Sequence, residues 1–88
     1  MNGSTSQTLA IAQELTPEVL ETVHDMFEYH SWNDDQLKQG KAVREALENA
    51  ARIIVRNVPP GPDRSVAIRK IREARMDANS AITHNGKY

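Results

Sequence analysis

The chain has 88 residues, of which 39% are hydrophobic and 26% charged, and it contains no cysteine. This length allows one small domain at most, and the composition is typical of a globular protein. The lack of cysteine excludes disulfides, Cys-based zinc sites and thiol chemistry. No apolar run approaches the roughly 20 residues that span a bilayer, and the N-terminus has no signal-peptide pattern. We therefore expect a cytoplasmic protein that does not bind a membrane.

Charge is divided unevenly along the chain. Residues 1–35 contain seven acidic residues and no Lys or Arg, whereas residues 36–88 contain all eleven Lys and Arg and five acidic residues. Two interpretations are open. Either an acidic N-terminal arm packs on the basic part of its own or a neighbouring chain, or part of the basic surface binds an anionic ligand.

The N-terminal third predicts short helices. Residues 6–15 are compatible with a short, weak helix. Thr16-Pro17-Glu18 is a clear helix start, with Thr as N-cap, Pro at the first position and an acid in the first turn. Apolar residues then recur at three-four spacing over about three turns, which predicts an amphipathic helix. They are Val19, Leu20, Val23, Met26 and Phe27.

A long second helix follows an aromatic-rich segment at 27–32. Asn33 is the expected N-cap, and Gln36 stands where a capping box requires it. Apolar or small residues continue at helical spacing for some 24 residues, or about 35 Å. They are Leu37, Gly40, Val43, Leu47, Ala50, Ala51, Ile54 and Val58. We expect Gly40 to be a packing glycine.

The prolines at 59 and 60 end that helix, and Pro62 or Asp63 opens a third one. The third helix has apolar residues at Ala67, Ile68, Ile71, Ala74, Ala78, Ala81 and Ile82. A turn this short between two long helices predicts antiparallel packing. The expected fold is therefore all-α, with an N-terminal arm and short helix (1–33), a long antiparallel helical hairpin (34–83) and a C-terminal tail (84–88).

The expected seam between the two long helices is rich in alanine, which buries little area per residue. It comprises Ala46, Ala50, Ala67, Ala74, Ala78 and Ala81. Because the resulting core is thin for such long helices, we expect a homo-oligomer in which helices pack against symmetry mates.

Catalytic and metal-binding patterns are weak. The three histidines, His24, His30 and His84, lack metal-ligand spacing, and the acidic residues do not form a recognisable pair. We therefore expect no enzyme activity, no cofactor and no metal.

Binding residues are easier to identify. The third helix carries five Lys or Arg residues between positions 64 and 75, which suits phosphate recognition or a solvated face. Tyr29, His30 and Trp32 are candidates for stacking on bases, although Trp32 is equally suited to packing on the hairpin. Asn79 lies among alanines on the inward side of its helix, so its amide needs a partner in the protein or in a ligand.

These residues resemble the hairpin domain shared by phage anti-CBASS and anti-Thoeris cyclic-nucleotide sponges. The resemblance covers about residues 27–83. Its motifs are Phe27-x-Tyr29-His30, Val43-Arg44-Glu45-Ala46 and Pro59-x-x-x-Asp63-Arg64-Ser65-x-Ala67-Ile68-x-Lys70-x-x-Glu73-Ala74-x-Met76-x-Ala78-Asn79-x-Ala81-Ile82. The acidic N-terminal third lies outside it.

The resemblance implies a non-catalytic protein that sequesters cyclic di- or trinucleotides or cyclic ADP-ribose isomers in pockets between subunits, often of a hexamer. By motif, it implies ligand contacts from Tyr29, His30, Arg44, Arg64, Ser65, Lys70 and Asn79. The basic residues would neutralise phosphates and the aromatic ones would stack on bases.

Two alternatives remain from the sequence. One is a small helical nucleic-acid-binding protein that uses the basic third helix, although a pI near 6.3 and the lack of a helix-turn-helix pattern disfavour it. The other is a structural assembly protein that binds no nucleotide.

Overall fold

The computed structural model describes residues 13–88, and most of this part of the chain is helical. Helices α2 (Pro17–Phe27), α3 (Asp34–Asn57) and α4 (Pro62–Thr83) follow one another, without a strand anywhere in 13–88. The all-helical prediction is confirmed. Residues 13–15 are not helical, and the rest of the helix expected over 6–15 lies outside the described residues.

Local capping explains where each helix begins. Thr16 Oγ1 accepts the amide N–H of Val19 at 3.1 Å, and Pro17 occupies the first turn of α2. Asn33 and Gln36 form the expected capping box, in which each side chain accepts the backbone N–H of the other residue at 2.8 and 2.9 Å. Helix α4 begins at Pro62, after Gly61 as N-cap without a side-chain capping bond.

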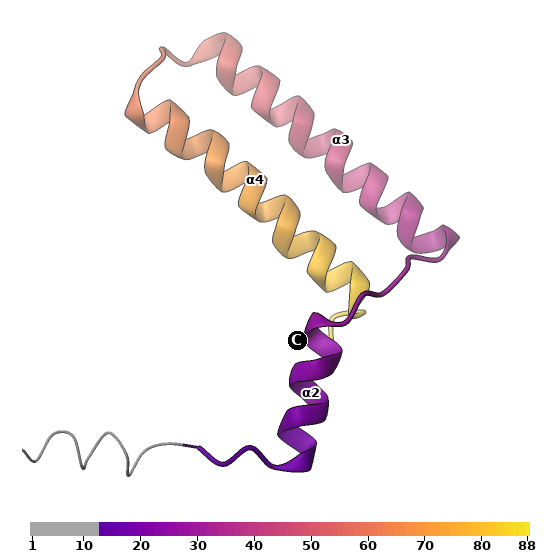
Figure 1. The fold of residues 1–88 in the computed structure, drawn as a ribbon. Coiled ribbons are helices and arrows are strands. Elements are labelled where there is room, and N and C mark those ends of the chain that lie inside the picture. The colour runs from indigo at the N-terminus through magenta and orange to yellow at the C-terminus, as the bar shows by residue number, and fades with distance from the viewer. Residues whose placement is uncertain (1–12) are drawn as a thin grey trace, which may run out of the picture.

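Helices α3 and α4 lie side by side, joined by residues 58–61 (Figure 1). At the turn, the Arg64 guanidinium donates to the carbonyl oxygens of Val55 and Val58 at 3.4 and 3.3 Å. At the opposite end, Gln36 Nε2 donates to the carbonyl of Ile82 at 3.0 Å. We call this opposite end, formed by the first turn of α3 and the last turn of α4, the base of the pair. Hydrogen bonds from a side chain to the backbone therefore connect the two helices at both ends of the pair.

The contact between α3 and α4 is narrow. Its half-buried apolar members are Val43, Leu47, Ala50, Ala51, Ile54, Val66, Ala67, Ile68, Ile71, Ala78 and Ile82. Three alanines expected in this seam, Ala46, Ala74 and Ala81, are exposed instead. Two helices cover only the strips that face each other, so residues at the edge of each predicted stripe remain in solvent.

No apolar side chain within residues 13–88 is fully buried. The radius of gyration is 19.7 Å, against about 12 Å for a compact domain of this length. Helix α2 extends away from the base of the pair rather than covering it (Figure 1), and its apolar stripe is open, with Phe27 84% exposed. None of the described helices is long and apolar enough to cross a membrane.

Trp32 packs at the base of the pair. Its indole Nε1 donates to Thr83 Oγ1 at 2.8 Å, which joins the segment before α3 to the end of α4. The six-membered ring lies on the backbone of Gly40, which is the one buried residue in 13–88. A Cβ at position 40 would overlap that ring, so Gly40 is a packing glycine, as expected.

We predict that Gly40→Ala destabilises the fold by about 1 kcal/mol or more. Overpacking costs about 1–3 kcal/mol, and the loss of the Trp32–Thr83 bond adds to it, which together outweigh the better helix propensity of Ala. Thermal unfolding followed by circular dichroism at fixed protein concentration measures this. Gly61→Ala is the control, since a Cβ at Gly61 meets nothing within 4 Å. Equal midpoints for the two variants would contradict the role of Gly40.

Candidate functional site

The residues that the resemblance implicates in ligand binding do not converge within one chain. Tyr29, in the segment between α2 and α3, is 87% exposed. Ser65 and Lys70 are exposed on α4, whereas His30 lies near α2 at the base of the pair. A pocket that used all of them would have to combine surfaces of several chains.

Two of these residues lie in the seam between α3 and α4. Arg64 is half-buried and donates to the last carbonyls of α3, where a cation also interacts favourably with the helix dipole. Its guanidinium therefore already has a structural partner. Asn79 is half-buried in α4, and its side chain makes no hydrogen bond within residues 13–88. The amide of Asn79 is consequently available to a ligand or to another chain.

Trp32 is also engaged inside the chain. Its indole N–H is bonded to Thr83 and one part of its ring lies on Gly40. This arrangement favours the packing interpretation of Trp32 over the stacking one, because a base could reach only what remains of the half-buried ring.

Arg44 lies at a basic hollow on one face of the pair. The hollow has a volume of about 190 Å³ and an apolar floor of Leu47, Ala51 and Ile71. Arg44 on α3 and both Arg72 and Arg75 on α4 stand around it. Lys70 points elsewhere, since two residues along a helix correspond to about 200° of rotation from Arg72. An apolar floor with a cationic rim suits a ligand with a flat ring and phosphate groups.

Glu48 also lines the basic hollow, but its carboxylate forms an ion pair with Arg52, four residues further along α3. Its negative charge is thereby partly compensated. The three arginines around the floor make no ion pair among the described residues. The basic hollow therefore carries a net positive charge.

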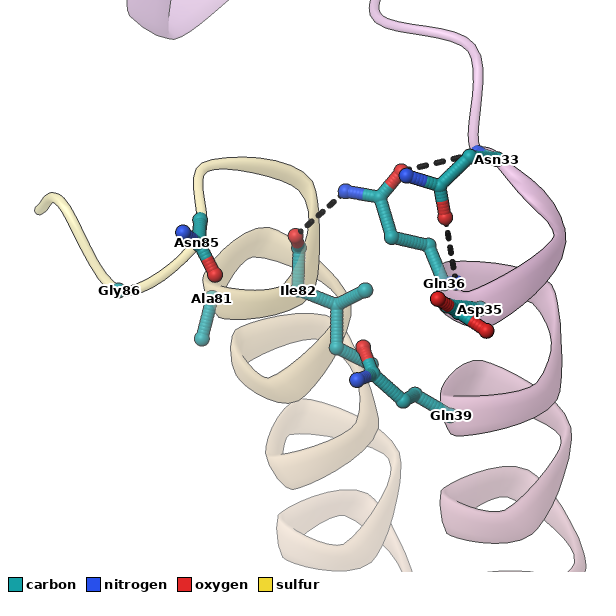
Figure 2. Close-up of a pocket in the computed structure, with 8 residues that line it drawn as sticks. All are labelled: Asn33, Asp35, Gln36, Gln39, Ala81, Ile82, Asn85 and Gly86. Carbon is teal, nitrogen blue, oxygen red and sulfur yellow. Dashed lines mark hydrogen bonds between the residues drawn. The ribbon is translucent and has the colours of Figure 1, made fainter.

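A larger, polar hollow of about 680 Å³ lies at the base of the pair (Figure 2). Its walls include Asn33, Gln36, Asp35 and Gln39 from the start of α3 and its cap, with Asn85 beyond α4. Figure 2 shows Gln36 already bonded to Asn33 and to the Ile82 carbonyl. The hollow lacks any Lys or Arg and contains a carboxylate. It is therefore unsuited to phosphate, despite its size.

A second cluster, which we call the Asp25 cluster, joins α2 to the C-terminal tail. It comprises Asp25, His30, His84, Lys87 and Tyr88. The Tyr88 hydroxyl donates to Asp25 Oδ2 at 2.6 Å and Lys87 Nζ lies 3.5 Å from the same oxygen. His30 Nε2 donates to the backbone carbonyl of Asp25 at 2.8 Å. The His84 ring packs edge-on against His30 and Tyr88, with centroids 5.1 and 5.0 Å apart.

The contacts of Asp25 shift three pKa values. The hydrogen bond from Tyr88 holds the pKa of the Asp25 carboxyl below its usual value, and the charge of Lys87 acts in the same direction. In return, the bond to Asp25 raises the pKa of the Tyr88 hydroxyl, and the negative charge of Asp25 raises the pKa of Lys87. These shifts favour an ionised Asp25, a charged Lys87 and a protonated Tyr88 hydroxyl. In these states the tail makes its contacts with α2.

The Asp25 cluster could not be recognised from residue spacing. Asp25 and Tyr88 are separated by almost the whole described chain, and the tail reaches α2 because it turns sharply after α4. Asn85 and Gly86 both have left-handed backbones, with φ of 53° and 73°, and Gly86 N–H bonds back to the Ala81 carbonyl at 2.9 Å. The pair Asn85-Gly86 is the local signal of that turn.

The acidic arm does not cover the basic helices of its own chain. Helix α2 meets the rest of the structure at the base of the pair through Asp25, and its other acidic side chains, Glu18 and Glu21, are exposed. Within the described residues, the arm contacts the basic part of its own chain at Lys87 of the tail and does not pack along α3 or α4. Packing on a neighbouring chain and binding of an anionic ligand both stay predictions.

Comparisons of the chain with models of protein families, with curated proteins and with solved structures find no match. The function of the chain is therefore inferred from its own residues.

We predict that Thr83→Val costs about 1 kcal/mol of the free energy of unfolding. The substitution keeps the size of the side chain but leaves the half-buried Trp32 N–H without its acceptor. Chemical denaturation followed by Trp fluorescence measures the change. Thr22→Val, at an exposed position on α2, is the matched control and should stay within about 0.5 kcal/mol of the wild type. A neutral Thr83→Val would show that the indole bond contributes nothing to stability.

Proposed function

We propose that this protein binds and sequesters cyclic nucleotide messengers, without chemical conversion, as a phage anti-defence sponge in the host cytoplasm. The observation that carries the proposal is the basic hollow, where Arg44 of α3 and Arg72 and Arg75 of α4 surround an apolar floor. A cyclic dinucleotide carries two negative charges and a trinucleotide three, so these guanidiniums match the charge of either ligand. Purine rings would lie on Leu47 and Ile71 and against the guanidinium planes.

The proposed binding unit is an antiparallel helical hairpin formed by α3 and α4, assembled into a homo-oligomer. Sub-micromolar binding requires more than about 8 kcal/mol, and one shallow hollow on one chain encloses too little of a ligand to supply it. A second chain over the hollow would exclude water and add residues that lie on other faces, such as Tyr29, Lys70 and Asn79. The resemblance to the sponges favours a hexamer.

Assembly also accounts for the exposed apolar surface. Leu20 and Val23 on α2 are 51% and 44% exposed, and Ile53 and Met76 on the α3–α4 pair are 53% and 67% exposed. A chain without a buried apolar side chain in 13–88 gains its missing hydrophobic stabilisation by covering these surfaces with further copies of itself.

The double variant Leu20→Glu/Val23→Glu should dissociate the oligomer. Burying two carboxylates in an apolar interface costs several kcal/mol, so the assembly shifts to smaller species. Light scattering after size-exclusion chromatography gives the mass of each variant. Thr22→Glu, on the polar face of the same helix, is the control. A wild-type protein that is monomeric at micromolar concentration would overturn this part of the proposal.

Ligand binding is tested with a panel of cyclic di- and trinucleotides and cyclic ADP-ribose isomers. We expect one class to raise the thermal midpoint and to be released intact on denaturation. Arg44→Gln should weaken that binding at least about tenfold while leaving the melting of the free protein unchanged, because loss of one charged hydrogen bond costs about 1.5–3 kcal/mol. Arg56→Gln, twelve residues along α3 and so about 18 Å away, is the matched control.

The same panel, extended with DNA and RNA at low and moderate salt, separates the alternatives. Recovery of a linearised nucleotide would indicate an enzyme. Binding of DNA or RNA that falls steeply with salt would indicate a nucleic-acid-binding protein. No response to either set of ligands would favour a structural assembly protein.

A further inference from the structure

We propose that Asp25, His30 and His84 form a binding site for a divalent transition-metal ion, most suitably Zn²⁺, which fastens α2 to the end of α4. The three residues come from three separate segments: α2, the segment before α3, and the residue that follows α4. Their potential ligand atoms all lie within 4.8 Å of one another. This site does not depend on the proposed function.

The distances are close to those of a loaded site. Asp25 Oδ1 lies 3.6 Å from His30 Nε2, and Asp25 Oδ2 lies 3.9 Å from His84 Nδ1. An ion at about 2.0–2.1 Å from each atom of a tetrahedral site requires ligand atoms roughly 3.3 Å apart. Since one ligand atom from each residue lies within 4.8 Å of the others, the three atoms would have to approach one another by up to about 1.5 Å, and rotation of the two imidazoles and of the carboxylate is the movement that would bring them together.

The donor set selects the ion. Two imidazole nitrogens and one carboxylate oxygen suit Zn²⁺ and its neighbours in the first transition series, whereas Mg²⁺ and Ca²⁺ prefer oxygen ligands. With three protein ligands, the fourth position falls to water or to the Tyr88 hydroxyl, which already contacts Asp25. The site lies partly out of solvent, since the His84 side chain is only 9% exposed.

The surrounding charge also favours a cation. Helix α2 and its C-cap carry Glu18, Glu21, Asp25 and Glu28 without any Lys or Arg, and the glutamates line a hollow of about 370 Å³ beside Asp25. The nearby positive charge is that of Lys87, whose side chain is 64% exposed and can turn into solvent when the ion binds. The local field thus concentrates divalent cations at the Asp25 cluster.

Binding would replace one hydrogen bond by coordination. His30 Nε2 now donates to the Asp25 carbonyl, so the neutral ring would have to carry its proton on Nδ1 for Nε2 to become a ligand. Coordination of both imidazoles and of the carboxylate would replace that single, part-buried hydrogen bond. Since α2 is joined to the tail and the base of the pair through the Asp25 cluster, an ion bound there would hold α2 in one orientation.

The test uses the full chain, stripped of metal with a chelator and dialysed at pH 7.5. Titration with Co²⁺, as a spectroscopic probe, should produce visible d–d absorption that saturates at one ion per protomer, and Zn²⁺ should displace it and raise the thermal midpoint. Mg²⁺ in excess should not compete.

Variants assign the ligands. His30→Ala and His84→Ala should each weaken Zn²⁺ binding at least about tenfold. His24→Ala should bind as the wild type does, because His24 is 73% exposed and pairs with Glu28 at 3.6 Å. Asp25→Asn, which keeps the size of the side chain but removes the carboxylate, should weaken Zn²⁺ binding as well. Because it also weakens the contacts with Tyr88 and Lys87, the melting of the metal-free variant is measured beside its metal binding. The site would be overturned if the wild-type protein bound Zn²⁺ no more tightly than His84→Ala does. It would also be overturned if His24→Ala lost as much Zn²⁺ affinity as His30→Ala and His84→Ala. Cyclic-nucleotide binding measured on His84→Ala reports separately on the proposed function, because His84 is not among the residues that the resemblance assigns to the nucleotide.

Discussion

The structure depends on one constraint: two helices joined by a four-residue turn can bury only the narrow strips that face each other. In this chain those strips are made largely of Ala, Val and Ile, and they leave every apolar side chain in 13–88 at least partly in solvent. Hydrophobic burial within one chain is therefore small. The pair instead relies on specific polar contacts at its ends and, in our proposal, on further copies of the chain.

The two ends are tied differently. At the turn, Arg64 binds carbonyls that the end of α3 leaves without partners. At the base, Gln36 takes part in the capping box of α3 and also donates to the Ile82 carbonyl. Trp32 packs on Gly40 and donates a hydrogen bond to Thr83. The resemblance to the sponges suggests Arg64 as a phosphate ligand. Within one chain, however, its guanidinium already stabilises the turn by binding carbonyl oxygens at the end of α3.

The two candidate sites differ in what they require. The basic hollow is open and shared by two helices, so a ligand held there would gain most from a neighbouring chain that closes it. The Asp25 cluster is complete within one chain, because the left-handed turn at Asn85 and Gly86 returns the tail to α2. Because it lies at the base, the Asp25 cluster determines how α2, with its exposed apolar stripe, projects from the α3–α4 pair.

Local sequence by itself determined the helices and their starts: Thr16 with Pro17, and Asn33 with Gln36, act on residues within one turn of themselves, so their bonds are readable from spacing. It also determined that Gly40 packs closely. The tertiary structure decided which stripe residues are covered, since Ala46 and Ala74 lie just outside the strip where the helices meet. Only the tertiary structure places His30 and His84 next to Asp25. Their proximity depends on how α2, the base and the returning tail are arranged in space, which residue spacing along the chain does not indicate.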